Sequence, residues 1–185
     1  MTGAIVRTVS AFILLTAVTL LNGCGYRHMG VSGLPPALVG KRIAVATFVN
    51  RGYRAKMGAI LTGSLIEEFA KRTGGMVVAE KDAELRLDGT ILSYTTSAIS
   101  YTAADTVKEY RAAVTAECRL TERGSGKVLW KGTVTQWQDY PVNSAIAGPP
   151  NSDAVALQQN SEDAAIREIS RKIAQQVYQD VSDGF

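Results

Sequence analysis

Hydrophobic and polar residues alternate most regularly between residues 106 and 122. This period of two predicts a long β-strand with one face in a core. Similar strand signals cover residues 85–100 and 127–140. The glycine-rich turn Gly124–Lys127 separates the last two signals and predicts that they pair as an antiparallel hairpin. The expected core face of the middle strand carries Tyr110, Ala112, Val114, Ala116, Cys118 and Leu120.

Two further segments have the period of an amphipathic helix. Between residues 55 and 71, apolar residues recur every four positions, and Gly74 and Gly75 supply a stop. The second helix is predicted to begin at a Ser161 cap and to bury a stripe of isoleucine and valine. The residues before it, 141–160, are rich in small polar residues and proline and are predicted to form a mobile loop.

An apolar, β-branched run at residues 42–50 predicts the first strand, covered on both faces or flanked by neighbours. The order strand, helix, three strands, helix predicts an α+β fold. We expect a two-layer sandwich, in which two helices pack on one face of a mixed sheet of about four strands. The chain is predicted to hold a single such domain at residues 41–185.

The N-terminus has the profile of a secretory signal peptide. Arg7 is followed by an apolar run too short to span a bilayer comfortably, and the run ends in Leu-Asn-Gly-Cys24, which resembles the bacterial lipobox. Residues 1–23 are therefore predicted to be a cleaved signal peptide. Cys24 is predicted to carry a diacylglyceryl group and an N-acyl chain, which together anchor the protein to a membrane. The alternative is that Cys24 is an ordinary cysteine after an uncleaved hydrophobic segment.

Residues 24–40, rich in glycine and proline, are then an anchor and flexible arm. Gly25, next to the anchor, favours the outer membrane, because bacterial lipoproteins with Asp at this place tend to stay at the inner one.

Composition argues against several functions. The formal net charge is only +3, with acids and bases interspersed, so no nucleic-acid partner is expected. Cys118 has no second cysteine to pair with once Cys24 is lipidated, and it is predicted to be a buried hydrophobe. His28 is the sole histidine, which leaves no catalytic triad and no histidine-rich metal site. We therefore expect no enzymatic activity, no metal and no cofactor.

Several segments together resemble the lipopolysaccharide-assembly lipoprotein family LptE, in order along the whole mature chain. They are Cys24-Gly-Tyr-Arg-His28, Leu34-Pro-Pro36, Lys41-Arg-Ile-Ala-Val45, Phe48-Val-Asn-Arg51, Lys108-Glu-Tyr-Arg111 and Gly126-Lys-Val-Leu-Trp130.

The resemblance implies a partner of the outer-membrane lipopolysaccharide (LPS) translocon, one that sits as a plug inside the β-barrel LptD, helps it assemble and binds LPS. Candidate LPS contacts are Lys108 and Arg111, although both also fit an ordinary cross-strand charged face. Part of the expected basic patch is missing, because residues 145–160 contain no lysine or arginine. The candidate contacts with the barrel are Tyr101, Trp130, Trp137 and Tyr140.

Aromatic residues more often belong to a core than to an interface. Strand parity places Trp130 and Trp137 on opposite faces, so the one away from the helices is the better interface candidate.

Two other interpretations stay open. The chain fits another small envelope lipoprotein that forms oligomers or serves a secretion or efflux complex. A periplasmic enzyme or carrier would instead require a deep pocket with perturbed titrating groups.

Overall fold

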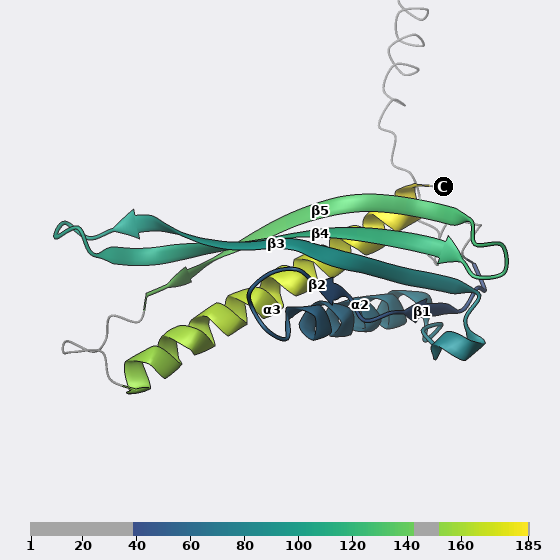
Figure 1. Cartoon of the computed structure of the whole chain (residues 1–185), viewed down its shortest axis with the longest axis horizontal. Coiled ribbons are helices and arrows are strands. Elements are labelled where there is room, and N and C mark those ends of the chain that lie inside the picture. The colour runs from purple at the N-terminus through teal and green to yellow at the C-terminus, as the bar shows by residue number, and fades with distance from the viewer. Residues whose placement is uncertain (1–38, 143–151, 185) are drawn as a thin grey trace, which may run out of the picture. The chain divides into compact units, whose positions relative to one another are not determined.

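The structure, a computed structural model, describes residues 39–142 and 152–184. Cys24 and nearly all of the predicted anchor and arm lie outside this range, and the statements about them stay predictions. The elements run in the order β1 (Ile43–Val45), β2 (Val49–Asn50), α2 (Met57–Thr73), the 3-10 turn η2 (Glu80–Asp82), β3 (Leu85–Tyr101), β4 (Val107–Glu122), β5 (Val128–Pro141) and α3 (Ser152–Asp183) (Figure 1).

The strands form one mixed sheet with the order β1-β3-β4-β5, and β2 also pairs with β3. β1 and β2 run parallel to β3, whereas the β3–β4 and β4–β5 pairs are antiparallel. The predicted mixed sheet and the predicted β4–β5 hairpin are therefore confirmed. Gly126 in the hairpin turn has a φ of 70°, a left-handed conformation that glycine adopts without strain.

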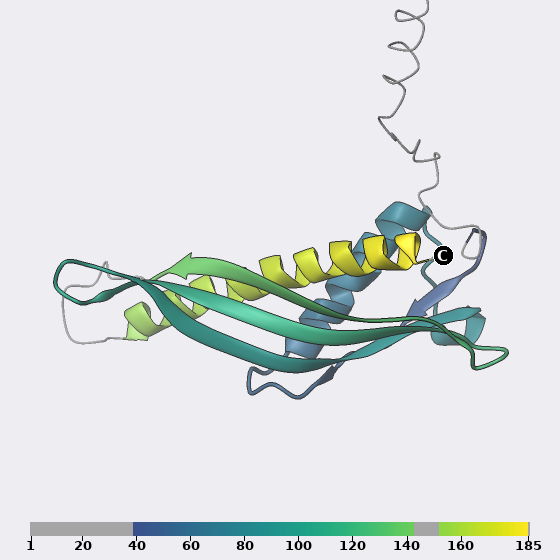
Figure 2. The same cartoon turned by 90° about the horizontal axis from the view of Figure 1, so that it is seen from above.

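Both helices lie on the same side of the sheet (Figure 2). The alternation along β4 places its core residues on this side. Ala112, Val114, Ala116, Cys118 and Leu120 are buried, with Cys118 0% exposed as expected, whereas Tyr110 is partly buried. Burial raises the pKa of the Cys118 thiol to about 12. The buried helix residues are Met57, Leu61, Leu65 and Phe69 on α2 and Ile166, Ile169, Ile173, Val177 and Val181 on α3.

The first predicted strand is divided in two. β1 pairs with β3 at Leu85–Leu87, whereas β2 pairs further along at Thr90 and Ile91. Between them Phe48 turns into the core, with its side chain 2% exposed and its backbone N–H donating to Thr62 Oγ1 at 3.0 Å. The single strand predicted over residues 42–50 is wrong because Phe48 leaves the ladder to fill the space over Gly89.

The loop predicted before the last helix is also wrong in its second half. α3 begins at Ser152, well before the expected cap at Ser161, and the Ser161 hydroxyl donates to the carbonyl of Leu157 at 3.2 Å within the helix. Residues 152–160 contain alanine, leucine and glutamine but no glycine or proline, so helix propensity favours an earlier start. The rest of the predicted loop, up to residue 151, lies outside the described range.

Gly89 on β3 leaves no room for a side chain, because a Cβ there would run into the Glu117 carbonyl oxygen of β4 and the Phe48 ring. Gly89→Ala should therefore lower the free energy of unfolding by about 1–3 kcal/mol through overpacking. Gly63→Ala is the matched control, since a Cβ at this helical position meets nothing within 4 Å. It should be neutral or stabilising by about 0.5–1 kcal/mol. Urea unfolding of the two variants tests this, and equal midpoints would contradict it.

Candidate binding surfaces

Arg111 lies on the face of the sheet that the helices leave uncovered. Its cross-strand neighbour is Asp139 on β5, and the two form a bidentate ion pair with Nε–Oδ1 and Nη2–Oδ2 distances of 2.7 and 2.9 Å. These hydrogen bonds hold the pKa of Asp139 below its ordinary value. The Arg111 guanidinium also lies over the Trp137 ring, 3.9 Å from its centroid. The predicted LPS residue Arg111 therefore already has a carboxylate partner.

Trp137 stands on the same uncovered face, with 48% of its surface exposed. Lys172 reaches it from α3, donating from Nζ to the Trp137 carbonyl oxygen at 3.2 Å and to Gln138 Oε1 at 2.8 Å. Its ammonium lies 5.8 Å from the Trp137 ring centroid. Trp137 thus has two cations beside it, Arg111 from β4 and Lys172 from α3. Of these two cations, the sequence predicts only Arg111 as a candidate LPS contact.

The other aromatic candidates are placed differently. Trp130 pairs with buried Leu120 and packs against the core, so the two tryptophans do lie on opposite faces as strand parity predicts. Tyr140 is 7% exposed and stacks on Tyr110 with ring centroids 5.8 Å apart. Burial raises the pKa of Tyr140 to about 12. Tyr140 is therefore a core residue rather than a surface for a barrel, because its register puts it on the covered face.

The tip of the β3–β4 hairpin carries the remaining candidates. Tyr101 closes β3 and is 58% exposed. The turn after it is ordered by Thr102, whose backbone N–H donates to the Thr106 carbonyl at 2.8 Å. Lys108 is exposed, and among the described residues its ammonium has no recorded partner. The β3–β4 register is irregular between Val107 and Glu109, where Lys108 lies, and Asp139 holds Arg111 further along β4, so the structure does not show the two side chains in one patch.

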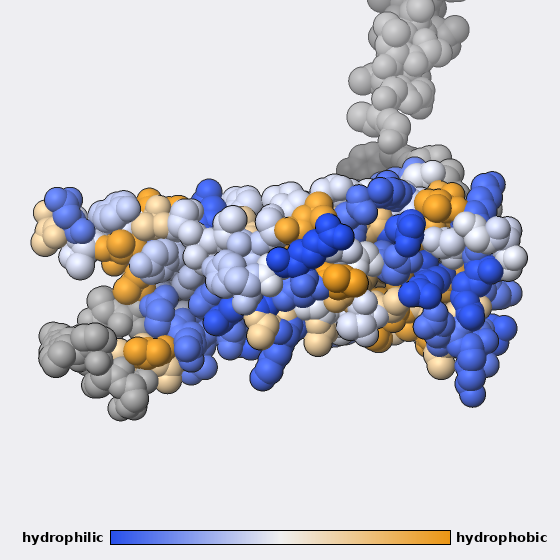
Figure 3. Space-filling model, in the orientation of Figure 1, coloured by the Kyte–Doolittle hydropathy of each residue, from blue (hydrophilic) through white to orange (hydrophobic). Residues whose placement is uncertain are grey.

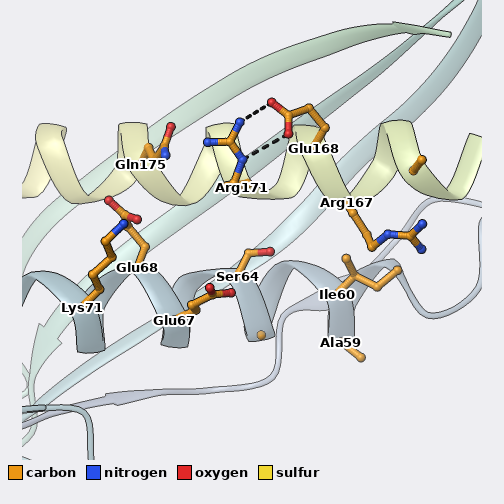
Figure 4. Close-up of a pocket in the computed structure, with 12 residues that line it drawn as sticks. Ala59, Ile60, Ser64, Glu67, Glu68, Lys71, Arg167, Glu168, Arg171 and Gln175 are labelled. Atoms are coloured by element: carbon orange, nitrogen blue, oxygen red, sulfur yellow. Dashed lines mark hydrogen bonds and ion pairs between the residues drawn. The ribbon is translucent and has the colours of Figure 1, made fainter.

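A groove of about 550 Å³ runs between α2 and α3 on the side away from the sheet. Both helices present small residues to this groove, and charges of both signs line it (Figure 4). Arg171 and Glu168 pair with each other on α3, and Arg72 pairs with Glu68 on α2 at 2.9 Å. The groove therefore offers neither a deep apolar pocket nor a surplus of one charge. The small residues that α2 and α3 present to the groove are Ala59, Gly63, Ser64 and Ala164.

A polar junction that sequence reasoning missed joins α3 to the sheet. The Tyr94 hydroxyl on β3 donates to Glu162 Oε1 at 2.5 Å, and Arg54 Nη2 lies 3.2 Å from Glu162 Oε2 and 3.0 Å from Asp163 Oδ1. Burial, followed by the bond to Glu162, raises the pKa of Tyr94. Glu162 and Asp163 thus lie within α3 and tie it to β3 and to the loop before α2.

Two kinds of feature are absent from the described part of the chain. Within residues 39–142 and 152–184, no three His, Cys, Asp or Glu side chains gather in a way that could hold a metal ion. No helix in those ranges is both long and apolar enough to span a membrane. In the view of Figure 3, hydrophilic side chains cover most of the surface and hydrophobic ones form small separate patches.

Comparison with known proteins identifies the family. Residues 40–181 match the family LptE, described as lipopolysaccharide-assembly. The chain therefore belongs to the lipopolysaccharide-assembly family LptE, a non-enzymatic family of envelope lipoproteins. A search of curated proteins gives no match.

Solved structures show similarity in fold. A hypothetical protein from Chlamydia trachomatis has a TM-score of 0.50 at 9% identity, with 77% of this chain and 95% of that chain covered. A putative lipoprotein from Caulobacter crescentus has a TM-score of 0.47 at 17% identity, covering 76% and 91%. The rare lipoprotein B of Shewanella oneidensis has a TM-score of 0.47 at 15% identity, covering 75% and 93%.

The polar junction gives a test of how α3 is held. Tyr94→Phe removes the hydroxyl but keeps the ring, leaving part of the Glu162 carboxylate without its donor, and should lower the free energy of unfolding by about 1–2 kcal/mol. Tyr53→Phe is the matched control, because Tyr53 is 72% exposed and its ring contacts the Tyr94 ring at a tilted angle, with centroids 5.3 Å apart. Thermal unfolding followed by circular dichroism compares them. Equal losses in the two variants would show that the hydroxyl bond contributes nothing.

Proposed function

We propose that this protein is the lipoprotein subunit of the outer-membrane LPS translocon. In this role it occupies the lumen of the β-barrel LptD, assists the assembly of that barrel and binds LPS on its way to the outer leaflet. The observation that carries the proposal is the family match over residues 40–181. That match favours this role over an oligomer-forming lipoprotein or a component of a secretion or efflux complex.

The uncovered face of the sheet supports a place inside a barrel. Its charges cancel between neighbouring strands, since Arg119 lies 2.8 Å from Asp88 and Lys131 lies 2.9 Å from Glu117. Between the pairs stand hydroxyl side chains, such as Thr115 and Thr135, whose oxygens are 3.0 Å apart. Barrel interiors are polar, and a face whose charges are already paired across strands suits such a wall better than a face with unpaired charges.

LPS carries phosphates, which favour lysine and arginine donors. Lys108 is the strongest candidate, because its ammonium is exposed and no described carboxylate neutralises it. Arg111 is less available, since Asp139 already occupies its guanidinium. Lys172 joins Arg111 around Trp137 and partly offsets the missing basic residues of the segment 145–160.

The proposal also includes the anchor. We expect Cys24 to carry diacylglycerol and an N-acyl chain at the periplasmic face of the outer membrane. The glycine- and proline-rich arm would then connect this anchor to the folded domain.

Affinity purification of the tagged protein from solubilised outer membranes should recover LptD in roughly equal amount. The control is an unrelated lipoprotein with the same anchor and tag, which should recover none. Recovery of no barrel, with the protein present in the membrane fraction, would count decisively against the translocon role. A self-oligomer in its place would support the oligomer-forming alternative.

Lys108→Glu should weaken binding of purified LPS by about tenfold, which corresponds to ~1.4 kcal/mol. Lys81→Glu makes the same charge change at another exposed lysine, in η2 next to the opposite end of β3, and should leave binding within about twofold. Both affinities can be measured with immobilised protein and LPS in detergent. Equal weakening by the two variants would indicate a general charge effect and would remove Lys108 from the site.

A further inference from the structure

One edge of the sheet is left without a partner. β1 and β2 pair with β3 at residues 85–87 and 90–91, but β3 continues to Tyr101 with only β4 beside it among the described strands. Within the described ranges, no backbone or side-chain group makes a hydrogen bond to the outer edge of β3 beyond Ile91. Figure 2 shows β2 ending well before the tip of the β3–β4 hairpin.

The direction of the free backbone groups follows from the register. Ile91 turns its carbonyl away from β4, because that oxygen accepts the N–H of Arg51 at 3.1 Å. A bulge then adds Leu92, and the ladder is regular from Ser93 opposite Thr115 to Ala98 opposite Tyr110. In an antiparallel ladder, alternate residues point their N–H and C=O groups to the same side. The outward residues are therefore Tyr94, Thr96 and Ala98.

The loop before α2 shields only the first of these three residues. A Cβ on Gly52 would lie 3.7 Å from the Tyr94 backbone nitrogen. The open part of the edge thus begins at Thr96.

The composition of this edge is unusual for one that stays exposed. Residues 92–101 read LSYTTSAISY, with no charged residue and no proline. Soluble proteins normally protect an edge strand with lysine, proline, inward-pointing charges or bulges, because unpaired backbone groups attract other strands. This edge has register irregularities at residues 91–93 and 98–101 but no lysine, proline or inward-pointing charge. The opposite edge has this protection: β5 carries Lys131 and ends at Pro141, and Lys172 binds the Trp137 carbonyl.

We propose that the edge of β3 from Thr96 to Tyr101 accepts an extended segment of the barrel partner by β-strand addition. This inference rests on the proposed function. The wall strands of a closed barrel are paired on both sides, so the added segment must come from a loop or a terminal region of LptD. The side chains near the free edge are small and neutral on both faces of the sheet. Thr95 and Ser97 lie on one face, and Thr96 and Ala98 lie on the other. They fit an uncharged segment.

The size of the edge argues against a second copy of this chain as the occupant. The open edge from Thr96 to Tyr101 has six residues and is about 20 Å long at ~3.4 Å per residue. A strip of this length buries much less than the ~1,200 Å² of a stable complex. A segment that belongs to a partner already held by other contacts does not need that area.

The test uses a proline that affects only the outer edge. Because the Thr96 N–H points away from β4, Thr96→Pro removes an outward donor and leaves the β3–β4 ladder intact. Thr96→Ala is the matched control, since it removes the side chain but keeps the N–H. In affinity purification of the full-length lipoprotein from outer membranes, Thr96→Pro should recover about tenfold less LptD than wild type, and Thr96→Ala should recover the wild-type amount. Circular dichroism of both purified variants checks that they fold.

A second measurement avoids any folding defect of the proline variant. A photoreactive benzoylphenylalanine at position 96 should crosslink to LptD in intact cells, and mass spectrometry should place the crosslink in a loop or terminal segment.

Each other outcome has a distinct meaning. If Thr96→Pro is folded and recovers LptD as wild type does, the edge proposal is overturned and the translocon role stands. If wild type recovers no LptD, both fail. Equal losses for Thr96→Pro and Thr96→Ala would assign the contact to the side chain instead of the backbone. A crosslink to a second copy of the chain would replace the barrel segment with a homodimer.

Discussion

The contact between the apolar stripe of α3 and the alternating face of β4 and β5 is the interaction on which the other features of the domain depend. Ile169, Ile173 and Val177 are 0% exposed in this contact, and the strand residues opposite them are equally buried. Because a strand turns successive side chains to opposite faces, covering one face determines the orientation of every other residue on these strands. Tyr140 thereby belongs to the core and Trp130 packs against it, whereas Trp137 and Arg111 face outward.

A sandwich with helices on one side leaves a second face and its edges for other contacts. The second face neutralises its charges across strands, as Arg111 does with Asp139, and this arrangement differs from the strongly basic surface that an anionic ligand would select. The edges are unequal, because β3 has 17 residues whereas β1 and β2 together pair with only a few of them. Binding by this domain is thus better explained by its faces, edge and hairpin tip than by a pocket.

The family match and the geometry contribute different information. Membership in the LptE family defines the envelope process in which the protein takes part, but the solved structures share too little sequence to carry over any contact residue. The geometry separates the candidates: Lys108 is exposed without a described partner, Arg111 is held by Asp139, and Tyr140 is buried. It also adds Lys172, which approaches Trp137 from a helix far away in the sequence.

The sequence by itself determined the elements whose signal is local. A period of two identified β4 and its core face, a period of about four identified α2, and strand parity separated Trp130 from Trp137. Tertiary structure decided what depends on partners distant along the chain, such as the Arg111–Asp139 pair, the approach of Lys172 to β5 and the Tyr94–Glu162 bond. The break at Phe48 is of the same kind, since only packing over Gly89 reveals why the strand stops. The physical reason is that periodicity encodes which face of an element is apolar, whereas register and helix placement arise only when the elements pack together.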